Sequence, residues 1–448
     1  MIPDQDSAKA WRLILFFTFL NIINFVDRNL IVGFSKTIVD DLGLSDTQYG
    51  LLTGLVFTVF YTIVGLLLGM MADRFNRPRL IAAGLFIWSL MTAASGAARS
   101  FSQMGLARLL VGAGEATLTP TALSLLSDVV PPHRRAMASG FYYLGVPVGT
   151  GAGLIMAGIL GPQLGWRNSF YLMGIAGMAL TGGLLLINDP PRGGMENVSV
   201  PAERPAFPAI LRGLLEALRE SPALCWVIGG SVITHIGLSA TFFDIQWLIA
   251  ERGMNQSSAP ILAGCVYTVA GAIATVFGGR IADYFHDRYS GGKLKFLAVA
   301  LTLAVPFMIA YRFVPASNPI FYVCLFTSCM ALTVFYGPVF SAIQDLAPVH
   351  VRSTAIAFSL FMSNMAGVGL GAFLTGAVID HLSAVGAGEA TANALVAWLM
   401  DLTDGQLTAE PMTYGTLLFA LAGMTAPIPY FIAAHYYQRS RDRVLGTR

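Results

Sequence analysis

Charge is the scarcest property of this sequence. Only 12% of its 448 residues are Asp, Glu, Lys or Arg, whereas average soluble domains contain about 25%. So few charges cannot cover the surface of a soluble protein of this length, and most of the surface must therefore face lipid. The net charge is only +2, so bulk charge gives no reason to expect a nucleic-acid partner.

Several catalytic and metal-binding patterns are also missing. The four cysteines lie inside apolar stretches and lack zinc-binding or redox spacing, so we interpret them as packing residues. The sequence contains no Gly-x-Ser-x-Gly, no His-Glu-x-x-His and no Gly-x-x-x-x-Gly-Lys-Ser/Thr stretch. We therefore expect neither an enzyme nor an ATP-driven pump, and we expect no metal and no cofactor.

Long apolar segments, in contrast, fill the chain, and 55% of the residues are hydrophobic. A bilayer core of about 30 Å requires roughly 20 apolar residues per helix, and helices satisfy every backbone amide in lipid. The sequence predicts an all-α membrane protein of twelve transmembrane helices. Their approximate spans are 13–37, 47–72, 79–98, 103–128, 135–161, 166–187, 222–250, 257–283, 294–312, 318–345, 351–380 and 412–437.

A proline-rich linker separates the sixth helix from the seventh. It covers residues 188–221 and ends in a short amphipathic run, 209–220. We therefore predict an N-terminal six-helix bundle (1–187), this linker, and a C-terminal six-helix bundle (222–448).

The distribution of basic residues predicts the orientation of the chain. With the N-terminus inside, 20 of the 27 lysines and arginines fall in inner loops and tails and five fall on the other side; Arg28 and Arg108 lie within helices. We expect both termini and the linker in the cytoplasm.

A charged hairpin closes the second helix, in the stretch Gly69-Met-Met-Ala-Asp73-Arg74-Phe-Asn-Arg77-Pro-Arg79. A weaker copy, Gly279-Arg-Ile-Ala-Asp283, occurs half a chain later, which indicates two similar halves. The pattern resembles the signature loop of the major facilitator superfamily. This resemblance implies the major facilitator fold with pseudo-two-fold symmetry, and a hairpin in which Gly69, Asp73, Arg74, Arg77 and Asp283 control conformation.

Charged residues in mid-helix are costly in lipid and need a reason. The first helix carries Asn24, Asp27 and Arg28, and the fourth carries Arg108 and Glu115. At about 1.5 Å per residue, Asp27 and Glu115 both lie roughly 20 Å from the inner surface. Desolvation favours a protonated carboxyl group and a nearby arginine favours the ionised form. We therefore predict that the coupling ion is a proton, which Asp27 and Glu115 bind and release while Arg108 alternates between these acids and an anionic ligand. The alternative is a static ion network that holds the two helices together.

Several stretches in the N-terminal half resemble the spinster family more closely. They are Asn24-Phe-Val-Asp27-Arg28, Ala107-Arg108-Leu-Leu-Val-Gly-Ala-Gly-Glu115, Pro147-Val-Gly-Thr-Gly and Asp189-Pro-Pro-Arg-Gly193. The resemblance implies a proton-linked carrier of lysophospholipids or sphingoid phosphates, in which Asp27 and Glu115 take part in protonation and Arg108 contacts an acid or a headgroup. Arg28 and Asn24 are gating or substrate candidates. An organic-anion symporter or a multidrug efflux carrier of the same superfamily is the alternative.

The second half contributes little charge to the membrane. His235 and Asn364 are its candidate substrate or gating residues. An unperturbed histidine titrates near pH 6.5, although a lone histidine is more often a packing residue. Asp244 lies near the outer end of the seventh helix, where we expect it to reach water. A cavity that is polar on one side and apolar on the other would suit an amphiphile, and we expect a monomer in a bacterial inner membrane.

Overall fold

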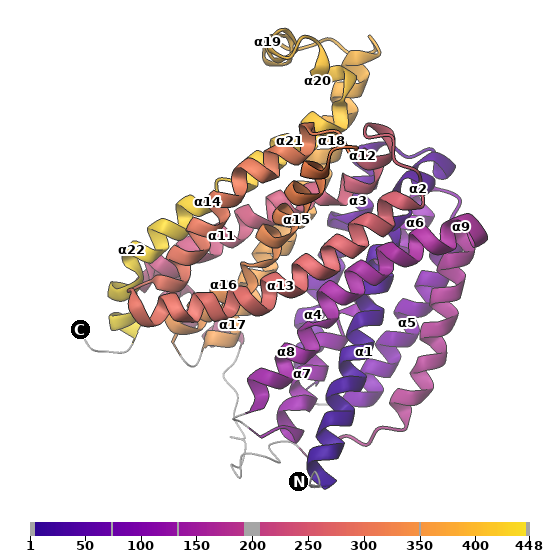
Figure 1. Ribbon diagram of the computed structural model, residues 1–448. Coiled ribbons are helices and arrows are strands. Elements are labelled where there is room, and N and C mark those ends of the chain that lie inside the picture. The colour runs from indigo at the N-terminus through magenta and orange to yellow at the C-terminus, as the bar shows by residue number, and fades with distance from the viewer. Residues whose placement is uncertain (1–4, 73–74, 132–133, 192–206, 349–350, 445–448) are drawn as a thin grey trace. The chain divides into compact units, whose positions relative to one another are not determined.

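A computed structural model describes residues 5–72, 75–131, 134–191, 207–348 and 351–444 of the chain (Figure 1). Within these ranges all regular elements are helices. Eleven of the helical stretches are long and apolar enough to cross a bilayer. One of them, Met137–Leu185, has 49 residues, about twice the length that one crossing needs. Gly165 interrupts it with φ 72° and ψ 169°, a left-handed φ that favours glycine, so this stretch supplies two crossings and the predicted twelve-helix architecture is confirmed.

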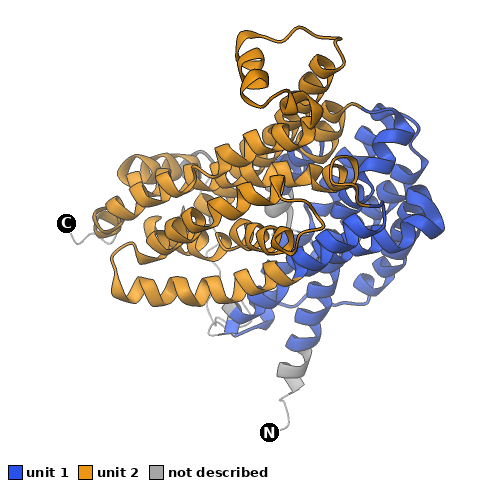
Figure 2. Cartoon of the chain, turned by 45° about the horizontal axis from the view of Figure 1, so that its top comes forward, with its two compact units in different colours: residues 1–44, 56–202, 255–268 blue, residues 45–55, 203–254, 269–448 orange. Residues whose placement is uncertain are grey.

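The chain forms two compact units (Figure 2). Unit 1 comprises residues 1–44, 56–202 and 255–268, and unit 2 comprises residues 45–55, 203–254 and 269–448. Two short segments, 45–55 and 255–268, thus group with the half of the chain from which they are distant in sequence.

Unit 1 is built around helices that pack on α1 and α5. Its elements are α1 (Gln5–Gly33), α2 (Ser35–Leu42), α4 (Leu55–Ala72), α5 (Arg77–Ala97), α6 (Phe101–Glu115), α7 (Leu118–Val129), α8 (Arg135–Tyr143), α9 (Gly145–Leu185) and the start of α13 (Ser258–Arg288). Phe17, Leu85 and Trp88 lie in its core. A Cβ added to Gly149 or Gly153 of α9 would lie 2.5 Å from Ile22 O or 2.7 Å from Val26 O, so these glycines allow α9 to pack closely on α1.

Unit 2 has its core among α11, α14, α16 and α22, with Leu224, Leu297, Ile343 and Tyr430 at its centre. Its elements are α3 (Asp46–Thr53), α10 (Phe207–Glu220), α11 (Pro222–Ser239), a 3₁₀ turn (Ala240–Phe243), α12 (Asp244–Ala250), the remainder of α13, α14 (Gly292–Phe313), α15 (Pro319–Thr333), α16 (Tyr336–Leu346), α17 (Arg352–Met362), a π-helix (Ser363–Gly369), α18 (Leu370–Gly386), α19 (Ala394–Leu402), α20 (Gln406–Ala409), α21 (Pro411–Gly423) and α22 (Pro427–Val444).

The second copy of the charged hairpin differs from the prediction. We expected the eighth helix to end at Asp283, but α13 continues to Arg288. Asp283 is therefore an exposed residue inside a helix rather than a loop residue. The chain turns later, through Gly291 with φ 65°, because the apolar pattern at Tyr284 and Phe285 still supports another helical turn.

Candidate functional site

The buried charges of unit 1 lie on α1 and α6, which meet through their side chains. Asp27 is 3% exposed, and Arg108 and Glu115 are each 1% exposed. Arg108 precedes Glu115 by seven residues, about two helical turns, so both lie on one face of α6. Arg108, Arg28 and Glu115 are all near enough to Asp27 for their charges to act on its carboxyl group. The structure thus brings together the four charged side chains that the sequence singled out in helices one and four.

The direct partner of Glu115 is Arg28. Nε and Nη2 of Arg28 donate hydrogen bonds to Oε2 of Glu115 at 3.0 and 2.7 Å. The Glu115 side chain is fully buried, whereas the Arg28 side chain is 23% exposed. We expected Arg108 to be the arginine that exchanges between the acids, so this pairing gives Arg28 a larger part than the sequence suggested.

Aromatic rings surround the Arg28 guanidinium group. Its central carbon lies 4.8 Å from the ring centre of Phe25 and 4.7 Å from those of Phe57 and Tyr61. Arg108 approaches the same Phe57 ring at 5.1 Å. Cation–π contacts hold a guanidinium in an apolar setting without neutralising its charge. The aromatic rings of α4 thus contact both guanidinium groups and stabilise them in their charged form.

Asp27 has a different partner. Oγ1 of Thr92, on α5, donates a 2.5 Å hydrogen bond to Oδ2 of Asp27. Among the described residues, neither Oδ1 of Asp27 nor Oε1 of Glu115 accepts a hydrogen bond, and Nδ2 of the buried Asn24 donates none. Buried polar atoms are usually satisfied, and exceptions are common where a site exchanges protons or ligands. Each carboxyl group thus has one oxygen that is held and one that can take a proton.

The glycines between Arg108 and Glu115 serve close packing. A Cβ at Gly112 would lie 2.7 Å from Phe57 O, and a Cβ at Gly114 would lie 2.8 Å from Gly84 O. These glycines draw α4 and α5 against α6 and so set the distance between the rings and the two arginines.

The charged hairpin is described only in part. Asp73 and Arg74 lie outside the described residues, and Gly69 lies in α4. Asn76 caps α5, because its Oδ1 accepts a hydrogen bond from Arg79 N at 3.0 Å. Arg77 is 1% exposed and pairs with two acids that the sequence analysis did not select, Asp128 at the end of α7 and Asp189 after α9.

His235 and Asn364 belong to unit 2. His235 is 4% exposed; its Nδ1 lies 2.8 Å from Ser231 O, and its ring meets that of Phe335 edge-on at 5.0 Å. Asn364 donates to Leu360 O at 2.9 Å and lies in the π-helix, which packs on α11 through a 2.9 Å Ser231–Ser363 hydrogen bond. π-helical turns are frequent at functional sites, but both side chains are engaged locally.

Asp244 does not reach water as we expected. It is 4% exposed and accepts a 2.6 Å hydrogen bond from Nη2 of Arg312, which is 1% exposed. The interpretation failed because the last turn of α14 places an arginine against α12, and linear spacing could not reveal this contact.

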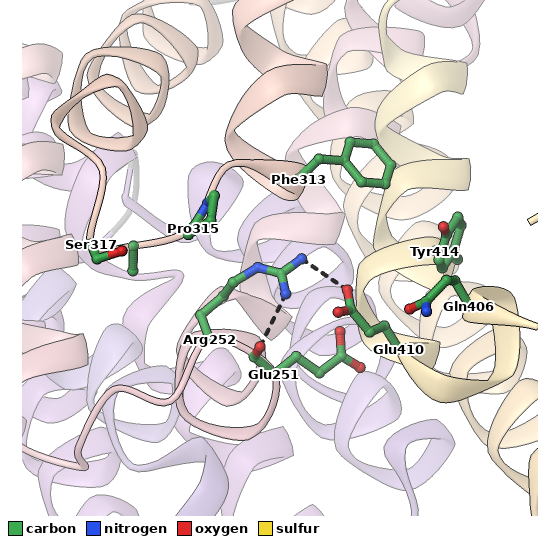
Figure 3. Close-up of a pocket in the computed structure, with 9 residues that line it drawn as sticks. Glu251, Arg252, Phe313, Pro315, Ser317, Gln406, Glu410 and Tyr414 are labelled. Atoms are coloured by element: carbon green, nitrogen blue, oxygen red, sulfur yellow. Dashed lines mark hydrogen bonds and ion pairs between the residues drawn. The ribbon is translucent and has the colours of Figure 1, made fainter.

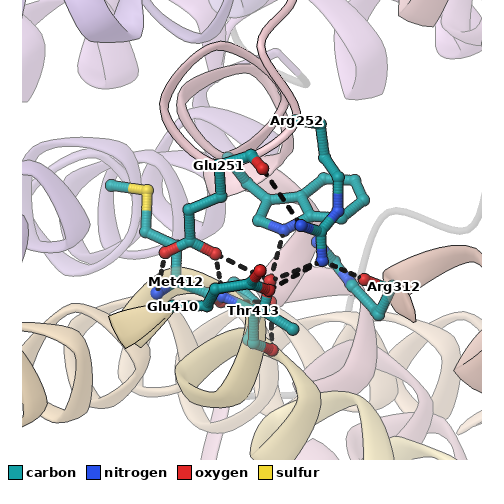
Figure 4. Close-up of polar contacts among 8 residues, drawn as sticks. Glu251, Arg252, Arg312, Glu410, Met412 and Thr413 are labelled. Atoms are coloured by element: carbon teal, nitrogen blue, oxygen red, sulfur yellow. Dashed lines mark hydrogen bonds and ion pairs between the residues drawn. The ribbon is translucent and has the colours of Figure 1, made fainter. Parts of the chain in front are cut away.

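A polar network continues from this pair along α12 and α21 (Figure 4). Glu251 accepts hydrogen bonds from Met412 N, Thr413 N and Thr413 Oγ1 at 2.7, 2.8 and 2.7 Å. Arg252 pairs with Glu410 at 3.0 Å and donates to the carbonyl oxygen of Arg312. The network therefore joins the ends of three membrane spans within unit 2.

A cavity of about 480 Å³ opens beside this network (Figure 3). Arg252, Glu410, Phe313 and Tyr414 are among the residues that line it. Arg252 and Glu410, both in its lining, point toward each other and are paired. The polar groups of the cavity are thus used within the protein, and we assign it a structural role.

A close seam joins α3 to α18. Asp380 accepts hydrogen bonds from Asp46 N, Thr47 N and Thr47 Oγ1 at 2.9, 2.8 and 2.5 Å, so its carboxylate caps the positive end of α3. A Cβ at Gly50 would lie 2.3 Å from Ala372 O. The sequence offered a signal for this seam only in the small residues Gly50 and Gly54, and no signal for Asp380.

Comparison with known proteins agrees with this architecture. The model of the family "Major Facilitator Superfamily" matches residues 17–372. The chain is 28% identical over 446 residues to an MFS-type efflux pump of Mycolicibacterium smegmatis, covering 97% of this chain and 96% of that protein. It is 25% identical over 390 residues to protein spinster of Drosophila melanogaster, covering 85% of this chain and 64% of that protein.

The fold is also similar to a solved structure, the crystal structure of a bacterial homologue of the human lysosomal transporter spinster in an inward-facing, unoccupied conformation. The TM-score is 0.77 at 26% identity, and the match covers 98% of both chains. The family model covers most of the chain. The relatives that the chain resembles are transporters rather than enzymes. This multi-pass membrane protein therefore belongs to the major facilitator superfamily of transporters, and within it resembles the spinster proteins.

Proposed function

We propose that the protein is a proton-coupled secondary transporter that moves an amphiphilic, lipid-like solute by alternating access. The observation that carries the proposal is the cluster of two buried acids and two arginines on α1 and α6. Two carboxyl groups with one unpartnered oxygen each offer places for a proton inside the membrane, where an ionised acid needs a specific partner.

The Arg28–Glu115 pair supplies the coupling. When Glu115 takes a proton, it can no longer neutralise Arg28, and the guanidinium must find another anion. A phosphate or carboxylate headgroup provides that anion, and the rings of Phe25, Phe57 and Tyr61 keep Arg28 in position meanwhile. Proton binding and anion binding thereby favour each other.

The lipid-like class of solute rests on two considerations. The resemblance to spinster proteins favours a lysophospholipid or a sphingoid phosphate, and the sequence of the second half brings little charge into its membrane spans. The similarity to an efflux pump favours a second candidate, an exporter of amphiphilic drugs, for which Asp27 and Glu115 would attract a cation. We further propose that the protein is a monomer in a bacterial inner membrane with both termini in the cytoplasm, because 20 of its 27 basic residues follow the positive-inside distribution.

Transport by purified protein in liposomes tests the proposal. With an imposed pH gradient, we expect a fluorescent lysophospholipid to cross faster than in empty liposomes. Glu115→Gln and Asp27→Asn should each remove the dependence on the gradient and leave a folded protein. Asp40→Asn, which changes an exposed acid paired with Lys36, is the matched control and should transport normally.

The outcomes separate the candidates. Flux of a cationic dye without flux of the lysophospholipid would support the efflux reading. Gradient-dependent flux that persists in both Glu115→Gln and Asp27→Asn would refute the coupling role of the cluster.

A further inference from the structure

Helix α10 of the linker carries more apolar surface than its own unit covers. Leu214 and Ala217, 4% and 3% exposed, pack into the core of unit 2. Leu211 and Leu215 lie on an adjoining stripe and are 45% and 47% exposed. A helix in water seldom leaves two leucines on one stripe uncovered, so the exposed stripe needs an occupant.

The neighbours of α10 mark the level of a bilayer surface. Only Ser221 separates α10 from the membrane span that begins at Pro222, and Cys225 Sγ contacts Leu218 O of α10 at 3.1 Å. Trp226, the fifth residue of that span, is 42% exposed. Tryptophan at the end of a membrane span is typical of the headgroup region. The C-terminal end of α10 therefore lies within about two helical turns of this tryptophan.

The end of α22 gives an independent marker of the same level. Ser440 Oγ accepts a hydrogen bond from Ala223 N at 3.5 Å, and Arg443 Nη1 donates to Glu220 O at 3.2 Å. Just before this point α22 exposes Tyr436, and just after it come arginines. A change from aromatic to basic residues is typical of a span that leaves the bilayer.

The charges on α10 are arranged for an anionic surface. At about 100° per residue, Arg219 and Arg212 lie about 40° and 60° from Leu215 around the helix. Glu216 and Glu220 lie about 100° and 140° from it. The arginines thus lie between the exposed leucine stripe and the acids, on one side of the stripe, with Glu216 about 40° beyond Arg212. Arginines beside an apolar stripe reach phosphates while the stripe enters the acyl region.

We propose that α10 is an interfacial helix of the bilayer in which the protein is embedded. Leu211 and Leu215 enter the boundary between headgroups and acyl chains, and Arg212 and Arg219 bind anionic phospholipid headgroups. Arg439 and Arg443, exposed at the adjoining end of α22, extend the basic surface. The helix thereby fixes the edge of unit 2 to the membrane plane, whichever solute the protein carries.

Depth measurements on the full chain in liposomes test the position of α10. The exposed cysteines Cys225 and Cys265 are replaced by serine, and a nitroxide is attached to Leu211→Cys, Leu215→Cys or Glu216→Cys. We expect oxygen, which concentrates in the acyl region, to relax the first two labels more strongly than a water-soluble nickel complex does. The label at the neighbouring position 216 should show the reverse order, and nickel-dominated relaxation at all three positions would overturn the proposal.

Lipid binding tests the arginines. Native mass spectrometry of the purified protein with added phosphatidylglycerol or phosphatidylcholine compares R212Q, R219Q and the double variant with K295Q, which removes an exposed cation outside α10. We expect the affinity for phosphatidylglycerol to fall about five-fold for each α10 arginine removed, with no change for phosphatidylcholine or in K295Q. Equal phosphatidylglycerol affinity in all variants would overturn the headgroup assignment.

Discussion

Arg77 makes the contacts whose loss should be the most costly among the described residues of the charged hairpin. It is 1% exposed, while the side chains of Asp128 and Asp189 are 11% and 18% exposed. Nε donates to Asp189 Oδ1 at 2.8 Å, Nη2 to Pro190 O at 2.8 Å and Nη1 to Ser124 O at 3.2 Å and to Asp128. Every nitrogen of the guanidinium group is thus engaged, and the contacts join the start of α5, the end of α7 and the chain after α9.

Arg77→Gln should therefore destabilise the protein by about 3–5 kcal/mol, the usual cost of removing one partner from a buried ion pair. Two carboxylates would remain close together without a counter-charge. Arg77→Lys keeps the charge but cannot reach both acids and the two carbonyls at once. We expect it to lose about 1.5–3 kcal/mol, as for a hydrogen bond to a charged group.

The assay is unfolding by SDS titration from a mild detergent, which yields a free energy of unfolding for each variant. Arg79→Gln is the matched control, because Arg79 is exposed two residues further along; its free energy should not change. The triple variant Arg77→Gln, Asp128→Asn, Asp189→Asn should recover part of the loss, because no uncompensated charge remains. If Arg77→Gln were no less stable than Arg79→Gln, the contacts would not stabilise the hairpin and the reasoning would be wrong.

Three further predictions concern other contacts. Gly50→Ala should weaken the α3–α18 seam, because its Cβ would lie 2.3 Å from Ala372 O. Gly182→Ala, whose Cβ would have no atom within 4 Å, is the control and should not destabilise the protein. Thermal unfolding in detergent compares the two variants, and equal melting temperatures would contradict the close packing of Gly50. Asp380→Asn should cost about 1–2 kcal/mol through the lost charge at the start of α3, measured by the same SDS titration with exposed Asp404→Asn as control; an unchanged free energy would show that the cap is unimportant. Thr92→Val removes the donor to Asp27 and should change the pH profile of transport in liposomes while leaving the expression level and melting temperature nearly unchanged, and an unaltered profile would remove Thr92 from the site.

The sequence by itself determined the membrane class, the number of helices and the family. A chain with only 12% charged residues must expose most of its surface to lipid. The number of apolar segments long enough to cross a bilayer gives the number of spans, and the stretch 69–79 carries the family resemblance. It also selected Asp27, Arg28, Arg108 and Glu115, because the cost of a charge in lipid is a property of each residue and its depth. These signals depend on neighbouring residues along the chain, and the sequence alone is therefore enough to identify them.

Only the tertiary structure decided which charges are partners. Arg28 holds Glu115, Asp128 and Asp189 hold Arg77, and Arg312 holds Asp244, because partner choice depends on how each helix is rotated and how closely it approaches the next. Glycines such as Gly112 and Gly50 set those approaches through contacts with distant backbone. The extension of α13 past Asp283 and the grouping of residues 45–55 with unit 2 likewise follow from packing between segments far apart in sequence, which spacing along one chain does not encode.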